Sequence, residues 1–286
     1  MPRLDARASL AATLVRTFMV FACLYFLLPL LLLAFASTKT LGDLNASFGL
    51  WFGPNGFHLV DNLAELFTFQ DGIFVRWLVN SLLYAAVGAG VAALIAAMAG
   101  YALAKYHFSG RNLVFQLVLA GVLMPSTLLV IPQFILFAKI GLNDTVWAML
   151  LPGSISVLGV YVSRVFAEAA VHDDLIDAAR LDGASELTIF TSISLPLLRP
   201  AMVTVFLLQF VAIWNNLLLP QMVLSSPQLF SVTAGLNVWL NSGFNQPGIR
   251  QVVVAGSLVS TLPLVIGFVT LQKYWRAGVA VGAIKG

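Results

Sequence analysis

The sequence is dominated by six apolar runs, each long enough to cross a bilayer as a helix. A span needs about 20 apolar residues to cross roughly 30 Å of hydrocarbon, and every backbone group there must be bonded internally, which forces a helix. Only 9% of the residues are charged, against roughly a quarter in soluble domains. The sequence therefore predicts an all-α integral membrane protein with six transmembrane helices, at about 17–37, 78–104, 113–138, 146–165, 201–224 and 251–272.

The first run has a second reading, as a signal peptide. Arg16 precedes the apolar stretch, and Ala34-Phe35-Ala36 is a small-residue site of the kind that signal peptidases cleave. The run exceeds the usual signal-peptide core of about 7–15 residues, so a retained helix is favoured. The expected organisation is an N-terminal segment at 1–16, one transmembrane domain at 17–272 and a C-terminal tail at 273–286.

The basic residues predict the orientation. Six spans put both termini on one side, and eleven of the fifteen Lys and Arg then lie on that side. The other side holds only Lys39, Arg76, Lys139 and Arg250. Because Lys and Arg concentrate in cytoplasmic loops, both termini and the loop 168–199 are expected to face the cytoplasm of a multi-pass protein in a cell membrane.

Several kinds of chemistry are missing from the sequence. It contains no phosphate-binding loop motif, so no ATP hydrolysis by this chain is expected. Its three histidines lie far apart in connections and its one cysteine lies in an apolar run, so neither a catalytic nor a metal site is expected. No basic stripe suits a nucleic acid. The spans also lack interior ionisable residues, which argues against a proton- or sodium-driven carrier.

The polar residues of the fifth run are neutral. The stretch 206-FLLQFVAIWNNLLLPQ-221 contains Gln209, Trp214, Asn215 and Asn216. Amides beside an indole ring suit a neutral hydroxylated ligand, because they offer paired donors and acceptors next to a flat apolar face. Hydrogen bonding between helices explains the same residues equally well. These four side chains are therefore candidates for a solute path.

Two further patterns concern packing and an outer loop. The second run, 84-YAAVGAGVAALIAAMAGYALA-104, is rich in small residues that permit close helix packing. Pro125, Pro132 and Pro263 should kink or break their helices. The loop from Ser225 to Arg250 has no charge before Arg250 and suits either docking on a protein or neutral ligand, or lying at the membrane interface. Its amide and aromatic candidates are Asn237, Trp239, Asn241 and Phe244.

The loop 168–199 holds six of the twelve acidic residues, between Glu168 and Glu186. Asp173 or Asp174 can cap a short helix, and Asp174 with Asp177 resembles a capping box. Gly183 suits the left-handed residue that ends a helix, and Ser185 can cap a second one. The expected apolar face comprises Leu175, Ile176, Ala178, Ala179 and Leu181. Pro196 and Pro200 should break the chain before the fifth span.

This loop resembles a known motif. Asp177-Ala178-Ala179, three residues, Gly183, nine residues and Ile193-Ser194-Leu195-Pro196 fit the EAA-x3-G-x9-I-x-L-P loop of ABC importer permeases. Asp177 departs from the usual Glu, which keeps the charge and shortens its reach. Further stretches resemble the carbohydrate-uptake branch, in particular the second permease subunit of maltose-type importers: 100–112, 124–133, 140–145, 213–220 and 272–286.

The resemblance implies a type I ABC importer permease fold, with a coupling helix between the fourth and fifth spans. In that family the loop sits in a groove of a separate ATP-binding subunit, which implicates Asp177, Ala178, Ala179, Asp182 and Gly183. It also implies a homologous permease partner, two ATP-binding subunits that bind the ATP and Mg²⁺, and an extracytoplasmic solute-binding protein that the Ser225–Arg250 loop contacts. The expected cargo is a sugar or oligosaccharide. A permease for another polar solute, such as glycerol phosphate, a six-span secondary carrier or a non-transporting scaffold remain as alternatives.

Overall fold

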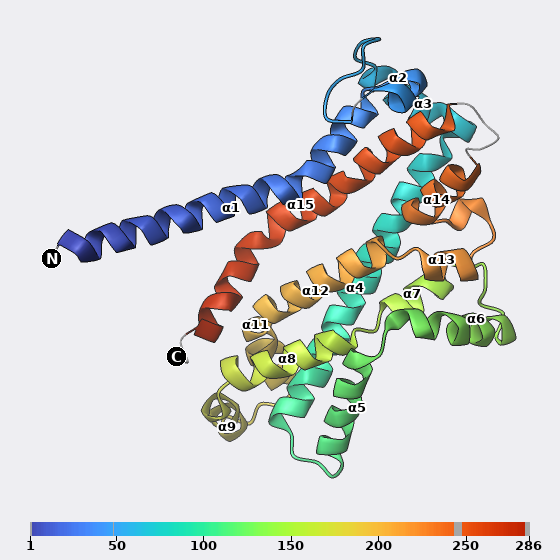
Figure 1. The fold of residues 1–286 in the computed structure, drawn as a ribbon. Coiled ribbons are helices and arrows are strands. Elements are labelled where there is room, and N and C mark those ends of the chain that lie inside the picture. The colour runs from blue at the N-terminus through green and yellow to red at the C-terminus, as the bar shows by residue number, and fades with distance from the viewer. Residues whose placement is uncertain (1, 48, 243–247, 284–286) are drawn as a thin grey trace. The chain divides into compact units, whose positions relative to one another are not determined.

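A computed structural model describes residues 2–47, 49–242 and 248–283, with side chains for 12–47, 49–242 and 248–272 (Figure 1). Within these ranges the chain is helical, apart from turns, loops and one isolated bridge between Gly53 and Gly56. It divides into two compact units, and each is described by itself. The first contains residues 1–72 with 238–260, and the second contains 73–237 with 261–286.

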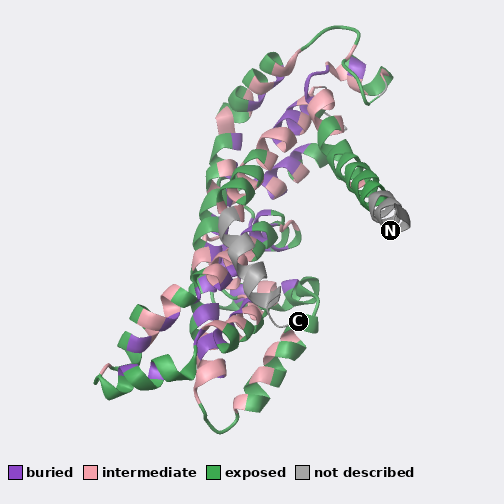
Figure 2. Cartoon of the chain, turned by 90° about the vertical axis from the view of Figure 1, so that its left-hand side faces the viewer, coloured by how far each residue is buried: buried purple, intermediate pink, exposed green. Residues whose placement is uncertain are grey.

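The first unit begins with the long helix α1, Pro2–Ser37. Two short helices follow, α2 at Leu41–Ala46 and α3 at Leu59–Thr68. Thr40 caps α2, since its side chain accepts a hydrogen bond from Asp43 N. The segment η1, Phe69–Gly72, ends the unit's first portion, and its Gln70 and Asp71 adopt left-handed φ angles of 49° and 58°. The most apolar stretch of α1 has no buried residue (Figure 2).

The second unit is built around α4, Ile73–Lys105, which packs mainly against α8 and α12. The small residues of α4 allow this packing, as predicted. A Cβ placed on Gly100 would lie 2.6 Å from the backbone nitrogen of Arg164 in α8, so the two helix backbones approach closely only because that position is glycine. The first half of the unit continues with α5 (Arg111–Leu123), η2 (Ser126–Leu129), α6 (Val130–Lys139), α7 (Trp147–Gly153) and α8 (Val157–Ala170).

The second half of this unit starts with the loop of the predicted coupling motif. That loop forms α9 (Asp173–Leu181), α10 (Glu186–Thr188), the π-helical segment η3 (Ile189–Ser194) and α11 (Leu195–Leu197). Then come α12 (Arg199–Trp214), α13 (Leu218–Val223) and η4 (Pro227–Leu229). Helix α14 (Val232–Ser242) and helix α15 (Ile249–Ala283) each run from one unit into the other.

The described helices agree with six spans, with corrections to their continuity. Four are long and apolar enough to cross a membrane, and the number reaches six if each of two bent pairs is one span. The third predicted helix is wrong as a single rod, because α5 and the segment Ser126–Lys139 meet at 98°. The predicted fifth helix stops at Trp214 and resumes as α13, and α12 also meets Glu186–Leu197 at 72°. The fourth is likewise interrupted, between Gly153 and Val157.

Proline explains only one of these breaks in the way that the sequence suggested. Pro125 lies at the bend between α5 and η2, where its fixed φ and missing N–H end the helix. Pro132 instead lies in the first turn of α6, a position that needs no intrahelical N–H, and the helix continues. Pro263 lies inside α15, which is also unbroken. These last two prolines therefore do not break their helices, and the alternative of a kink at either one stays a prediction.

Candidate functional site

The helix of the acidic loop starts differently from the prediction. Helix α9 begins at Asp173, its N-cap is His172, and no side chain makes a capping hydrogen bond. The predicted Asp cap and the Asp174–Asp177 capping box are therefore wrong. Both Asp173 and Asp174 lie in the first turn, where a negative charge is favourable beside the helix N-terminus. Lys105 Nζ donates to Asp173 Oδ1 at 2.7 Å, and this contact lowers the pKa of that carboxyl.

The end of α9 confirms the predicted turn. Gly183 has a φ of +80°, the left-handed conformation that glycine adopts without a steric cost. Ala184 N donates to Ala179 O at 3.0 Å, which satisfies a carbonyl at the helix end. Ser185 Oγ then accepts from Thr188 N at 3.3 Å and caps α10. The chain therefore reverses sharply between two short helices.

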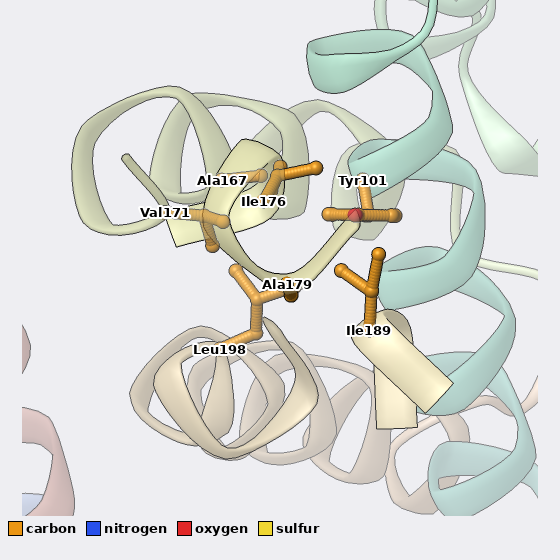
Figure 3. Packing of buried hydrophobic residues seen from close by; sticks show 7 residues of the cluster. All are labelled: Tyr101, Ala167, Val171, Ile176, Ala179, Ile189 and Leu198. Carbon is orange, nitrogen blue, oxygen red and sulfur yellow. The ribbon is translucent and has the colours of Figure 1, made fainter. Parts of the chain in front are cut away.

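One face of α9 rests on a small apolar cluster (Figure 3). Ile176 and Ala179, three residues apart and hence on one helix face, are buried there. They pack with Tyr101, Ala167, Val171, Ile189 and Leu198. The predicted apolar face was too wide. Leu175, Ala178 and Leu181 point outward, and Leu181 is 89% exposed.

A second polar contact attaches the far side of the turn to α4. Tyr106, the residue after the end of α4, donates to Glu186 Oε2 at 2.7 Å. Arg180 Nε donates to Glu186 Oε1 at 2.7 Å, and Arg180 Nη1 donates to Asp177 Oδ1 at 3.2 Å. Burial is the main cause that raises the pKa of Tyr106, with the hydrogen bond to Glu186 next. The segment between Asp173 and Glu186 is thus held at both ends by two consecutive residues, Lys105 and Tyr106.

Sequence reasoning missed these anchoring residues. Lys105 and Tyr106 follow directly after an apolar run, where a single basic residue is ordinarily read as a topology signal. The available hint was the excess of carboxylates in 168–186, which need partners or water. The pairing itself depends on tertiary structure, since 68 residues separate Lys105 from Asp173.

The four candidate path residues have different environments. Gln209 Nε2 donates to Gly153 O at 2.9 Å and to Ile155 O at 3.3 Å, and so bonds carbonyls at the break between α7 and α8. Trp214 is 2% exposed and stacks on Phe210. Asn216 Oδ1 accepts from Leu219 N at the start of α13. Asn215 is exposed, and its Nδ2 donates to Val211 O at 3.1 Å.

The outer-loop candidates also differ. In the second unit, Gln221 Nε2 donates to Asn237 Oδ1 at 2.6 Å. In the first unit, Trp239 is 2% exposed, its Nε1 donates to Gln70 Oε1 at 3.0 Å, and its ring meets Phe69 edge-on. Asn241 is exposed near the end of α14. Phe244 lies outside the described residues.

Asp144 is a further polar anchor that the sequence did not single out. Its carboxylate accepts hydrogen bonds from Ser225 N (2.9 Å), Ser226 N (2.8 Å) and Ser226 Oγ (2.5 Å). These bonds, led by the Ser226 hydroxyl, lower the pKa of Asp144. Its φ is +59°, which Asp tolerates better than most residues. Asp144 therefore fixes the connection between α6 and α7 against the end of α13.

Among the described residues, no group of three or more His, Cys, Asp or Glu could hold a metal ion. What the segment offers is a surface: an outward row of Asp177, Ala178, Leu181 and Asp182, held on a bonded and packed base. The base of this surface is bonded to Lys105 and Tyr106, where α4 ends.

Comparison with known proteins places these features in a family context. Residues 89–280 match the family described as binding-protein-dependent transport system inner membrane component. The arabinooligosaccharides transport system permease protein AraQ of Halalkalibacterium halodurans is 36% identical over 269 residues, 94% of each chain. The lactose transport system permease protein LacG of Rhizobium radiobacter is 31% identical, over 80% of this chain and 82% of its own.

A solved structure has the same fold. It is a bacterial ABC transporter involved in the import of the acidic polysaccharide alginate, and one of its chains matches with a TM-score of 0.78. The match covers 92% of this chain and 96% of that one at 18% identity. At that identity the likeness concerns the fold alone, and it confirms the predicted permease fold.

Proposed function

The chain belongs to the binding-protein-dependent transport system inner membrane component family, and from this premise we propose that it is the permease subunit of an ATP-driven importer of a neutral sugar or oligosaccharide. Permeases of this kind are transport components, and the ATPase is a separate subunit. The observation that carries the proposal is the 36% identity over 94% of both chains with a permease named for arabinooligosaccharide transport. Permeases named for lactose and maltodextrin transport are also similar.

The neutral character of the cargo has a second line of support. Within the spans, the polar candidates of the fifth run are amides and an indole, without an interior charge. Asn215 is the one of the four that is both polar and exposed, so its amide is the leading candidate for contact with solute in this subunit. Gln209, Trp214 and Asn216 support the shape of that region, since their polar atoms or rings are engaged by neighbouring segments.

The segment Asp173–Glu186 is the proposed contact with the ATP-binding subunit. Asp177, Ala178, Asp182 and Gly183 are exposed and available to a partner, whereas Ala179 is buried and acts by positioning the helix. The exposed Leu181 adds an apolar side chain that a partner's groove would cover. In this arrangement a movement of the ATPase passes to α4 through Lys105 and Tyr106.

The remaining partners follow from the family. A homologous permease would complete the path, two ATP-binding subunits would hold the ATP and Mg²⁺, and a binding protein would deliver the solute. We assign the loop containing α14 to contact with the binding protein, with Asn241 on its exposed surface and Trp239 as internal support. The basic residues favour cytoplasmic termini. We place the chain in the cell membrane of a prokaryote, since the similar permeases come from Halalkalibacterium halodurans and Rhizobium radiobacter.

The test is reconstitution of the full assembly in proteoliposomes, with arabinotriose, maltotriose and sn-glycerol 3-phosphate offered through the cognate binding protein. We expect ATP-dependent accumulation of a neutral oligosaccharide that persists when ionophores collapse proton and sodium gradients. Uptake confined to the phosphorylated solute would reject the sugar assignment. Uptake that needs an ion gradient and no ATP would reject the importer.

A further inference from the structure

The connection between α2 and α3 reverses the usual distribution of polar and apolar side chains. Within residues 49–58, Trp51 is 68% exposed, Phe52 42% and Phe57 58%. Nearby, Lys39, Asp43 and Asn62 are each at most 3% exposed. In a loop surrounded by water the aromatic rings would be covered and the charges would face outward.

Hydrogen bonds fix this arrangement. Lys39 Nζ donates to Ser47 Oγ at 2.9 Å, and Asn55 Nδ2 donates to Asp43 Oδ1 at 2.7 Å. Asn62 Nδ2 donates to Ser37 O at 2.8 Å and to Lys39 O at 3.0 Å. Buried polar groups persist when they are bonded in this way. The outward position of the rings is therefore built into the loop by its polar interior.

The rings form one cluster with the end of α1. Phe35 lies in the last turn of α1, with ring centroids 5.0 Å from Phe52 and 5.9 Å from Trp51. Phe52 in turn lies 6.0 Å from Phe57. The cluster is thus continuous with the exposed apolar surface of α1, the first predicted span.

Two features give the depth and the environment of the cluster. Arg16 and Lys39 bracket the apolar part of α1, and at 1.5 Å per residue Phe35 lies about 28 Å from Arg16 along the helix. With a hydrocarbon core of roughly 30 Å, this is the level of the headgroups. From Leu44 through Val60 the sequence contains no Asp, Glu, Lys or Arg. Trp and Tyr are enriched at that level, and Trp and Phe are common on the apolar face that interfacial segments bury there.

We propose that residues 49–58 form an interfacial anchor, in which Trp51, Phe52 and Phe57 insert among the lipid headgroups beside the outer end of α1. The anchor would hold the end of that helix at a fixed depth and would keep the polar interior of the loop dry. It does not depend on the cargo or on the ATPase.

The test places a spin label at single sites in the assembled transporter, in nanodiscs of phosphatidylethanolamine and phosphatidylglycerol. Cys23 is the protein's only cysteine, so a Cys23→Ser background allows Trp51→Cys and Phe57→Cys to be labelled one at a time. Glu65→Cys, at an exposed charged position of α3, serves as the control. Collision with dissolved oxygen and with a water-soluble nickel chelate is read by power saturation.

We expect the labels at 51 and 57 to collide readily with oxygen and at least threefold less with the nickel chelate than the label at 65. Nickel accessibility equal to that of the control would put the loop in water. Low accessibility to both reagents would put it under another protein chain. Either result overturns the proposal, and the two labelled sites guard against a local effect of one substitution.

Discussion

Tyr106 donates a 2.7 Å hydrogen bond to Glu186, directly after Lys105 makes a 2.7 Å contact with Asp173. The two acceptors lie on opposite sides of the left-handed turn at Gly183. One end of α4 therefore holds both ends of the segment that is proposed to meet the ATPase, and it holds them by polar contacts that can be removed one at a time.

Tyr106→Phe removes one of these contacts and leaves the ring in place. A net hydrogen bond is worth about 1 kcal/mol, so we expect uptake to fall up to ~fivefold while ATP hydrolysis continues. Transport and ATPase rates in the same proteoliposomes measure the ratio. Tyr161→Phe is the matched control, because its ring stacks on Phe115 outside this network. An equal loss of uptake per ATP hydrolysed in both variants would contradict a specific role of the Tyr106 hydroxyl in coupling.

Gly183→Val should uncouple hydrolysis from uptake. Apart from the adjacent residues, no heavy atom lies within 4 Å of a Cβ at this position, so a Cβ there is not crowded. The cost comes from the φ of +80°, about 1–2 kcal/mol for an L-residue and more for a β-branched one. Gly183→Asn, which tolerates that conformation, is the control and should retain coupling. Normal uptake by the Val variant would contradict the coupling role of the turn.

Gln209 and Asn215 should separate stability from transport. Gln209→Ala leaves the carbonyls of Gly153 and Ile155 without their donor, so we expect about 1–3 kcal/mol of destabilisation and a lower Tm. Asn215→Ala alters an exposed amide and should reduce uptake with little change in Tm. Thermal unfolding in detergent and uptake in proteoliposomes, measured on both variants, make the distinction. A lower Tm for Asn215→Ala together with lower uptake at normal Tm for Gln209→Ala would contradict the roles proposed for the two residues.

Asp144→Asn keeps a residue that tolerates a φ of +59°, removes the charge and replaces one of the two acceptor oxygens with an amide nitrogen. Because the pKa of Asp144 is lowered by its three hydrogen bonds, its contribution is present above the usual carboxyl pKa of about 3.9 and is lost as pH falls through the lowered value. We therefore expect a Tm deficit of a few degrees that is constant from about pH 5 to 8. A Tm deficit that vanishes within that range would contradict the lowered pKa of Asp144.

His58 should make the loop of the interfacial anchor sensitive to pH. Its Nε2 lies 3.1 Å from Asn55 O and its Nδ1 lies 3.0 Å from Asp61 Oδ2. Both partners are acceptors, so the doubly protonated ring suits the site, and the pKa of His58 is raised, first by Asn55 and then by Asp61. The contribution is complete below about pH 6.5 and is lost as pH rises through the raised pKa.

The measurement is the mobility of the spin label at 57 across pH 5.5–8.5. We expect mobility to increase on the alkaline side, where the ring becomes neutral, and we expect no such change in a His58→Ala background. Asp43 is the other acidic group that acts on this ring. A mobility that rises toward acid would reverse the sign and contradict the model of the loop.

The sequence predicted the features that depend on residues close together along the chain. The apolar runs predicted the spans, because lipid enforces helices, and Gly183 and Ser185 predicted the turn and cap, because those conformations suit few residues. It predicted α9 with the wrong start, since an Asp near a helix N-terminus is favourable both at the cap and in the first turn. Only the packing of α9 decides which two of its five apolar residues face inward.

The site depends on long-range contacts that no local pattern contains. Gln209 looks like a path residue in sequence, yet its partners are the carbonyls freed by the interruption after Gly153, 56 residues away. The interruption itself follows from Ser156 capping α8, which accepts from Gly159 N. Likewise, Trp239 reads as an exposed recognition residue until Gln70 and Phe69 are found around it.

The bend of 98° after α5 has a mechanical consequence. Helix α5 packs against α8, where the guanidinium of Arg164 lies 3.6 Å from the centre of the Phe115 ring, whereas α6 packs against α13. The two halves of the third span thus pack against different helices. They meet at Met124 and Pro125, where the helical hydrogen bonds are already interrupted. That short junction can serve as a hinge. If α5 and α8 rotate relative to α6 and α13, a few backbone torsions at the junction absorb the rotation, and neither half of the span has to unwind.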